Sequence, residues 1–515
     1  MPPSGRGIGD AYYNACAPVF GQQWRWTGAA LAMLVLLSGC AGVSPPPPDP
    51  DAPGGACRAF FADMDRAVTE TGVRDGVGAP AEGYPYLRGT RFLHAFHDDF
   101  DDPAVRSAWL DTAQETDRDA RALELINLGS EALSAIELPP GADNPWQAVA
   151  ACGDELRDLD GLDTDAAAWR EASAAAAVPD EYVTWHRAAG VYPVSRWFIR
   201  AGVASWQRGV RATFDSAPPR AEPAYRYGPA TEAALSQDQA ASRLAQAERD
   251  ALGQPRLSAR DRERLLAAHA PVIEVEGEAP HNRIGTPGHD ADGEPTADTS
   301  RPVVHTSVSS TRFAGETVVQ LNYTWWFTER PVDHWFDLLG GALDGLTLRL
   351  TLAPSGEPLL VETMHNCGCY HQYYPVQGLL ARARADYAEP PLVLPGPGYP
   401  ESGQRLHVRL EDGTHYVQAL TFATPQSRDQ APYAFEAYDR LRSLPAGDGE
   451  RRSLFQPDGL VAGSERRERW FFWVSGVPEP GAMRQSHRHA TAFVGRRHFD
   501  DPDLLDRIFE PVAAD

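Results

Sequence analysis

The sequence contains no lysine, so all 47 of its Lys and Arg residues are arginine. Without a lysine amine the chain has no side chain that forms a Schiff base, which excludes pyridoxal-phosphate enzymes and class I aldolases. It also has neither the lysine of a P-loop nor that of the S-x-x-K nucleophile motif. The missing residue type therefore excludes several large classes of enzyme.

Positive charge is scarce relative to negative charge. The 71 acidic residues give the chain a formal net charge of −24. Such a chain is repelled by nucleic acid, so we expect no nucleic-acid partner. Three motifs of common enzymes, H-E-x-x-H, G-x-S-x-G and G-x-G-x-x-G, are absent as well. Composition and motifs thus exclude more functions than they indicate.

Long apolar runs are missing except for one short stretch near the N-terminus. Residues 29–37, AALAMLVLL, are too few to cross a bilayer and fit the apolar core of a signal peptide. The chain continues into Leu37-Ser38-Gly39-Cys40, which resembles the lipobox of bacterial lipoproteins. This resemblance implies that residues 1–39 are a signal peptide and that Cys40 becomes lipidated, which makes the membrane a partner.

The residues after Cys40 bear on where the protein is anchored. In lipoproteins an aspartate after the lipidated cysteine favours the inner membrane, so Ala41 implies the outer membrane. Residues 40–56 are then the lipidated cysteine and a stalk, because VSPPPPDPDAPGG is extended and semi-rigid. We expect a lipid-anchored outer-membrane protein that faces the periplasm.

Cysteine is also rare, with six residues in the chain: 16, 40, 57, 152, 367 and 369. Once the signal peptide is removed and Cys40 is lipidated, four thiols remain in an oxidising compartment. Cys57 and Cys152 are the natural structural pair. Their disulfide would close a loop of about 95 residues, which corresponds to roughly 4–5 kcal/mol in the chain-entropy account.

The hydrophobic pattern predicts an α+β fold with an N-terminal helical domain and a mainly antiparallel β domain. Residues 57–270 show helical periodicity, including a stretch from 103 that opens with proline. Within it, the apolar stretch 182–206 is expected to form a buried helix pair. Residues 271–515 show strand patterns, among them 303–311, 316–327, 345–353, 357–365, the hairpin 405–422, and later 469–476 and 489–495.

The stretch 365–371, HNCGCYH, is the main candidate for chemistry. The turn at residues 354–357 predicts a hairpin in which Leu350 pairs with Val361 and Arg349 with Glu362. In this register His365 lies on the apolar face, and a continuing strand would turn Cys367, Cys369 and His371 the same way. A straight strand spreads these side chains too far for one ion, so Gly368 must bend the chain if they are to converge.

Three interpretations of this stretch remain open. Cys367 and Cys369 form a disulfide, or they bind a metal, zinc or copper, or one of them is a nucleophile activated by histidine. A metal site would use the ligands His365, Cys367, Cys369 and His371, completed by His487 or His489 from the C-terminal region.

The function expected from this pattern is a metal-dependent hydrolase of the cell envelope, acting on an unknown substrate. The metal would activate water, and Glu362 would shuttle protons, although the predicted register places it on the opposite face. The alternative is a non-catalytic envelope lipoprotein that binds or assembles a partner, with the C-x-C pair as a structural disulfide.

Overall fold

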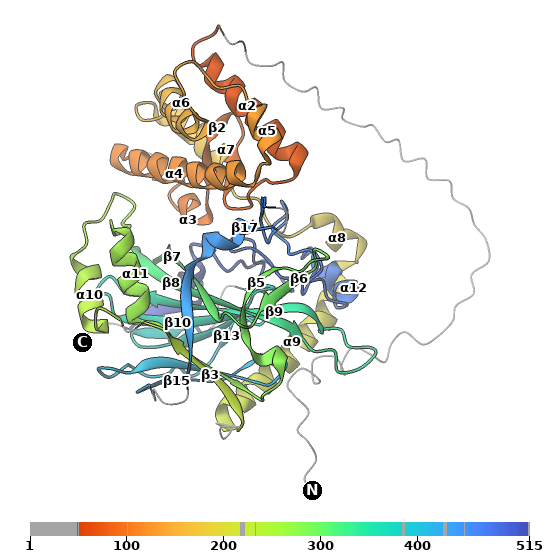
Figure 1. Ribbon diagram of the computed structural model, residues 1–515. Coiled ribbons are helices and arrows are strands. Elements are labelled where there is room, and N and C mark those ends of the chain that lie inside the picture. The colour runs from red at the N-terminus through yellow and green to blue at the C-terminus, as the bar shows by residue number, and fades with distance from the viewer. Residues whose placement is uncertain are drawn as a thin grey trace.

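The structure, a computed structural model, describes residues 49, 51–99, 101–216, 222–231, 233–383, 387–425, 430–446 and 449–512. The predicted signal peptide, the lipidation site Cys40 and most of the stalk lie outside these residues. The described part combines helices with a large mixed β-sheet (Figure 1). No helix in it is both long and apolar enough to cross a membrane.

The first hydrophobic core is built mainly by helices. A two-stranded sheet packs among them at the top of Figure 1. The elements are α2 (Gly55–Thr71), β1 (Ala79–Ala81), β2 (Tyr84–Gly89), α3 (Arg91–His94), α4 (Pro103–Asn127), α5 (Ser130–Ser134), α6 (Pro145–Leu159) and α7 (Ala166–Ala175).

Local signals set the helix starts in this unit. The side chain of Asp102 accepts a hydrogen bond from the Ala104 N–H at the start of α4, and proline occupies the first helical position. Asn144 caps α6 in the same way, again followed by proline. A proline costs nothing there because the first N–H groups of a helix have no intrahelical partner. The predicted helix from residue 103 is confirmed.

A disulfide links α2 to α6 inside this core. Cys57 and Cys152 are bonded, with their Cα atoms 5.1 Å apart. Both are buried beside Phe60 and Leu156. The bridge therefore joins two helices that are 95 residues apart in the chain.

The large sheet has thirteen strands, most of which follow the order β13-β11-β10-β9-β8-β7-β16-β3-β4-β14-β15, while β5 pairs with β8 and β6 with β5. Four neighbouring pairs are parallel, so the sheet is mixed. The strands are β3 (Ala224–Pro229), β4 (Val272–Glu276), β5 (Ile284–His289), β6 (Pro295–Asp298), β7 (Val303–Phe313), β8 (Glu316–Arg330), β9 (Gly341–Leu352), β10 (Pro358–His365), β11 (Gln372–Pro375), β13 (Leu392–Val393), β14 (Arg405–Leu410), β15 (Val417–Ala423) and β16 (Ala431–Ala437).

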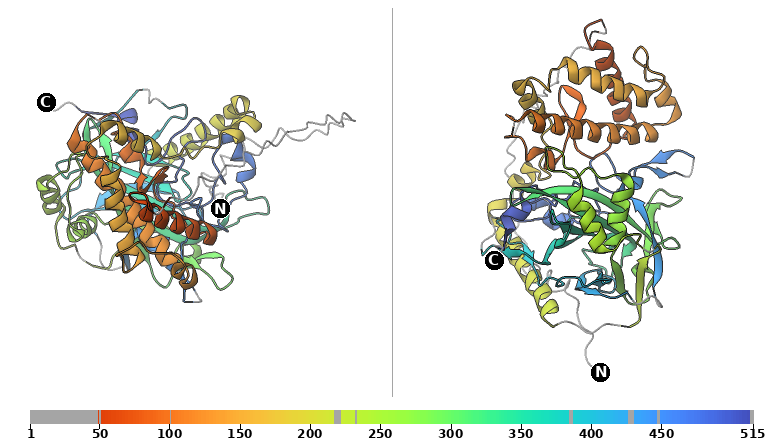
Figure 2. Two further views of the ribbon diagram at one scale, coloured as in Figure 1. Left: turned by 90° about the horizontal axis from the view of Figure 1, so that it is seen from above. Right: turned by 90° about the vertical axis from the view of Figure 1, so that its left-hand side faces the viewer.

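The sheet curls around the second core. Val408 of β14 and Leu348 of β9, from opposite halves of the strand order, belong to the same buried cluster. Helices from before residue 270 complete this cluster (Figure 2). They are α9 (Tyr192–Ser216), α10 (Gln237–Gln246) and α11 (Ala259–Ala268), with the short α8 (Thr184–Ala189) ahead of them. The second core therefore includes helices that precede residue 270, the predicted end of the helical domain.

The predicted hairpin register is confirmed over most of its length. Arg349 lies opposite Glu362 and Leu350 opposite Val361. The register shifts by one residue between Pro358 and Leu360. Such a bulge at the strand start leaves the later pairs in place.

Two predicted strands near the C-terminus are wrong. Residues 469–476 form the helix α12 (Arg469–Phe472) and the short 3₁₀ turn η3 (Trp473–Ser475). Residues 489–495 form no strand; Ala490 makes only an isolated bridge to His498. An aromatic run fits both helical and extended periodicity, so its tertiary contacts decide between them.

The remaining elements are two short strand pairs, one helix and two 3₁₀ turns. They are β12 (Leu379–Ala381) paired with β19 (Phe509–Pro511), β17 (Leu444–Pro445) paired with β18 (Arg451–Arg452), α13 (Leu504–Ile508), η1 (Pro280–Asn282) and η2 (Tyr438–Arg442).

The expectation of a buried helix pair over residues 182–206 is correct for its helices but wrong for its burial. Ile199, Val203 and Trp206 face the core, whereas Trp185, Trp197 and Phe198 are exposed.

We predict that replacing both Cys57 and Cys152 by alanine lowers the free energy of unfolding by about 4–5 kcal/mol, because the open loop regains its conformational freedom. Urea unfolding of the variant and of the oxidised wild type measures the difference. Wild-type protein treated with reductant should match the variant. Equal stability of the oxidised and reduced wild type would contradict the prediction.

Candidate active site

The stretch 365–371 forms a tight buried turn between β10 and β11. β10 ends at His365, so the alternation of the strand does not continue through the two cysteines. The Gly368 N–H donates to the His365 carbonyl at 2.8 Å, and the His365 N–H donates to the Cys369 carbonyl at 3.1 Å. Gly368 has a φ of 91°, which a side chain disfavours, and Tyr370 has a φ of 61°. The bend predicted at Gly368 is therefore present.

Asn366 fixes this turn to the sheet. Its Nδ2 donates to the Trp325 carbonyl at 3.2 Å, and its Oδ1 accepts a hydrogen bond from Thr347 Oγ1 at 2.9 Å. Its main-chain N–H donates to the Gly345 carbonyl at 3.0 Å. The turn therefore has a defined position beside strands β8 and β9.

The C-terminal region closes over the other side of the turn. The buried Arg484 donates from Nε to the Cys367 carbonyl at 2.9 Å. Its main-chain N–H donates to the Asn366 carbonyl, which also accepts a hydrogen bond from His489 Nε2 at 3.2 Å. A Cβ on Gly368 would meet the Ala490 carbonyl oxygen at 2.8 Å, so only glycine fits there.

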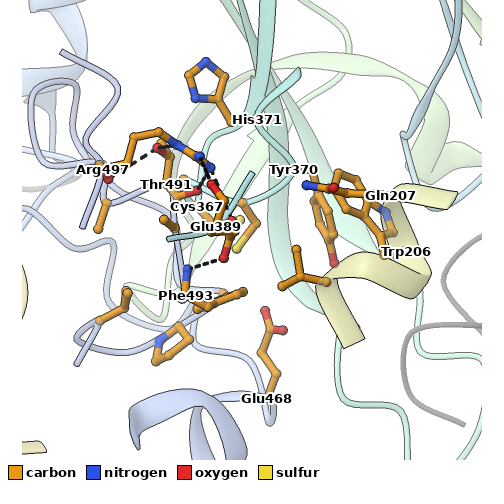
Figure 3. A pocket seen from close by; sticks show the side chains of 18 residues that line it. Trp206, Gln207, Cys367, Tyr370, His371, Glu389, Glu468, Thr491, Phe493 and Arg497 are labelled. Carbon is orange, nitrogen blue, oxygen red and sulfur yellow. Dashed lines mark hydrogen bonds and ion pairs between the residues drawn. The ribbon is translucent and has the colours of Figure 1, made fainter. Parts of the chain in front are cut away.

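Cys367 and Cys369 line a cavity of about 40 Å³. Figure 3 shows Trp206 and Gln207 of α9 on one side of the cavity, with Glu468 pointing into it. Glu389, on the other side, accepts hydrogen bonds from the Phe493 and Val494 N–H groups and is paired with Arg497. The space is sufficient for a few water molecules or one small polar group.

Both cysteines of the turn are free thiols, Cys367 buried and Cys369 partly exposed. A hydrogen bond with Cys367, together with burial, raises the pKa of Cys369 well above that of an ordinary thiol. Cys369 therefore holds its proton tightly, in a hydrogen bond with the Cys367 sulfur.

Two buried arginines lie close enough to this sulfur pair to act on its charge. Burial lowers the pKa of both Arg484 and Arg466. Negative charge on Cys367 or Cys369 raises the pKa of Arg484, and negative charge on Cys367 raises that of Arg466. Both guanidinium groups donate to main-chain carbonyls, Arg466 to Ala342 at 2.8 Å and Arg484 to Glu479 at 2.9 Å. Fixed positive charge beside a thiol favours its thiolate.

His371 points away from the thiols into a buried polar group. Its Nε2 lies 3.0 Å from Glu362 Oε1, and its Nδ1 lies 3.0 Å from the hydroxyl of Tyr373. The hydroxyl donates to Nδ1, so Nε2 carries the proton and donates to Glu362. Burial lowers the pKa of His371 to about 4. Glu362 therefore holds His371 rather than serving the thiols.

His365 belongs to a different buried group. Its Nδ1 lies 3.5 Å from Asp344, whose other oxygen is 2.7 Å from His415 Nδ1. The pKa of Asp344 is lowered well below its usual value, because the two imidazoles outweigh its burial. His415 stacks on Phe327, with ring centroids 3.7 Å apart.

The predicted metal ligands thus occupy separate environments. His489 reaches the turn but donates its Nε2–H to a carbonyl, and His487 pairs with Asp500 at 3.3 Å. Within the described residues, no group of three or more His, Cys, Asp or Glu side chains is arranged to hold a metal ion. The 489 region lies against the turn, as a mixed Cys/His site would require, but His489 is hydrogen-bonded to the Asn366 carbonyl. Cys40 lies outside the described residues.

Sequence reasoning missed the residues that surround the thiols. Arg484 is 117 residues from Cys367, and Trp206, Arg466 and Glu468 are similarly remote in sequence. Nothing in the local sequence around these four residues distinguishes them from other arginine, glutamate or tryptophan residues. Comparisons with protein-family models, curated proteins and solved structures found no match for the chain.

The buried imidazole of His371 predicts a loss of stability in acid. Its pKa is about 4 in the folded chain, against 6.5 when unfolded, so the unfolded chain binds protons more readily between these values. Stability is then full above pH 6.5 and falls as the pH decreases towards 4, by on the order of 3 kcal/mol for this group. Other buried histidines, His269, His305 and His489, act in the same direction.

Urea unfolding across this pH range, for the wild type and His371→Gln, isolates the contribution of His371. The variant should show a flatter dependence on pH. An NMR titration in which the His371 imidazole protonates near its ordinary pKa would contradict the assignment.

Proposed function

We propose that the protein is a thiol–disulfide redox protein of the cell envelope, with Cys367 and Cys369 as its working pair. The observation that supports this most directly is that two hydrogen-bonded free thiols line one cavity beside Arg466, Arg484 and Glu468. A dithiol needs a sulfur on which negative charge is stabilised and a second sulfur within reach.

The residues suggest an order of events. The Cys367 thiolate attacks a substrate disulfide, forms a mixed disulfide and expels the first substrate sulfur, which is protonated to a thiol. Cys369 loses its proton and attacks Cys367, which releases the second substrate thiol and leaves a Cys367–Cys369 disulfide. The pair has then given two electrons to the substrate, and the reverse sequence oxidises a dithiol.

Glu468 is the residue placed to accept the proton of Cys369. Its carboxylate points into the same cavity (Figure 3), and its charge contributes to raising the pKa of Cys369. A proton held tightly on the second thiol keeps it from reacting first, and a nearby carboxylate removes it during resolution.

The location in the envelope rests on the N-terminal sequence, which implies lipidation at Cys40 and an outer-membrane anchor. The Cys57–Cys152 disulfide supports an oxidising compartment. The substrate chemistry that fits is a disulfide or dithiol small enough to bring one sulfur into the cavity.

The metal-dependent hydrolase remains a competing proposal. It needs zinc or copper on the same two sulfurs, with further ligands drawn from His365, His371, His487 or His489. The arrangement of these side chains favours the redox function, because Glu362, Asp344, Asp500 and the Asn366 carbonyl already occupy the imidazoles.

The decisive experiment is a joint measurement of metal content and redox potential. The full chain, purified without chelator or reductant, should carry less than one metal ion per ten chains. In dithiothreitol redox buffers the pair should show one two-electron transition above about −300 mV, where structural disulfides remain oxidised. The Cys57–Cys152 bridge is the internal control that stays oxidised.

Variants separate the roles of the two cysteines and Glu468. Cys369→Ser should accumulate the mixed disulfide, and Cys367→Ser should form none. Glu468→Gln should slow resolution about tenfold or more. About one zinc or copper per chain, lost in the Cys367→Ser/Cys369→Ser variant, would reject the redox function and support the hydrolase.

A further inference from the structure

Exposed apolar side chains gather at one end of the molecule. Sixteen large apolar residues are exposed among the described residues, and ten of them lie in three short segments. The segments are the helix pair α8–α9, the loop between β8 and β9, and α12. Scattered exposed apolar residues are normal, whereas such a cluster marks an interaction surface.

The helix pair supplies five of the ten residues. Trp185, Trp197 and Phe198 are 65%, 59% and 62% exposed, and Val191 and Val194 are similarly open. The first turns of α9 therefore present apolar side chains to solvent, while later turns of the same helix enter the core.

The loop and α12 supply the other five residues, which are Val332, Trp335 and Phe336 in the loop and Trp470 and Phe471 in α12. The most exposed of all is Trp335, at 86%. We call the ten residues together the aromatic end. Four tryptophans and three phenylalanines with these exposures present on the order of 1,000 Å² of apolar surface with the valines, above the range usual for a soluble monomer.

Contacts between the segments make the aromatic end one surface. Arg467 Nη1 donates to the Trp335 carbonyl at 2.6 Å, which ties the loop to α12. A Cβ on Gly190 would meet Val474 at 2.5 Å, so the α8–α9 turn packs directly on η3, next to α12. Figure 1 shows α8 and α12 side by side.

The helix pair of this end has a charge opposite to that of the whole chain. Residues 184–214 contain five arginines and no acidic residue, although the chain has a net charge of −24. Arg196 and Arg200 are exposed between the apolar side chains. Salt screens charge beyond about 8 Å at physiological ionic strength, so a surface in contact with this end meets its local charge.

We propose that the aromatic end docks on a lipid bilayer. Tryptophan and phenylalanine side chains enter the interface between headgroups and acyl chains, where tryptophan is preferred. Arg196 and Arg200 lie beside them and bind lipid phosphates, since guanidinium groups bind phosphate with paired hydrogen bonds. The proposal does not depend on the redox function.

A second copy of the chain fits this surface less well. A symmetric dimer brings the same patch of each copy together, so the exposed Arg196 and Arg200 of both copies would gather at one interface. The helix pair offers no carboxylate between residues 184 and 214 to neutralise them. A bilayer containing phosphate groups has no such conflict.

The test uses the full chain with Cys40→Ser, so that no acyl chain is attached, and vesicles of phosphatidylcholine with a quarter of phosphatidylglycerol. Hydrogen exchange followed by mass spectrometry should show protection of all three segments when vesicles are added. Replacing Trp197 and Phe198 by serine should reduce the protection of the loop and of α12 at least tenfold, because both segments rest on the same bilayer.

Two further variants keep the test decisive. Trp335→Ser/Trp470→Ser, in different segments, should reproduce the loss. Trp146→Ser/Leu159→Ser replaces apolar residues that are 42% and 50% exposed elsewhere, and it should change nothing. The thermal unfolding of each variant is compared with the wild type, so that loss of fold is distinguished from loss of docking.

Three outcomes would overturn the proposal. Vesicles that leave the three segments unprotected would show that the aromatic end does not meet lipid. Segments already protected without vesicles, with the protein monomeric in sedimentation, would show that another part of this chain covers them. The same protection in a concentration-dependent dimer would show that a second copy does.

Discussion

The candidate site depends on one constraint: the polar main chain of the turn at residues 366–370 is buried and must find hydrogen-bond partners. The sheet supplies some through Gly345 and Trp325, and the C-terminal region supplies the rest through Arg484 and His489. A buried turn without these partners would cost several kcal/mol in unmade hydrogen bonds. The cysteines therefore occupy a fixed position because two distant parts of the chain meet there.

The same constraint explains the chemistry of the thiols. Arg484 enters the interior to satisfy carbonyl groups, yet its charge also reaches the sulfur atoms. A residue used for main-chain hydrogen bonding thus also sets the electrostatics of the cavity. His371 lines the cavity but turns its ring towards Glu362, and His365 is held by Asp344 in a separate buried group. Neighbouring positions in sequence thereby acquire unrelated roles.

The sequence allowed much of the sheet to be predicted, because alternation and charge pairing specify a register locally. Arg349 opposite Glu362 and the bend at Gly368 are examples. The same reasoning failed for residues 469–476, where a run of aromatic residues fits a helix and a strand equally well. It also failed for the surroundings of Cys367, since Arg466, Glu468 and Arg484 approach only through tertiary folding. The continuing strand that would have turned Cys367, Cys369 and His371 to one face is absent, because β10 ends at His365.

Helix α9 reaches both the aromatic end and the cavity of the thiols. It is a single run of 25 residues that carries Phe198 on the aromatic end and Trp206 on the wall of the cavity. Eight residues of helix span about 12 Å, and its hydrogen bonds make that length stiff. One helix therefore fixes both the position of Phe198 on the aromatic end and that of Trp206 on the cavity wall.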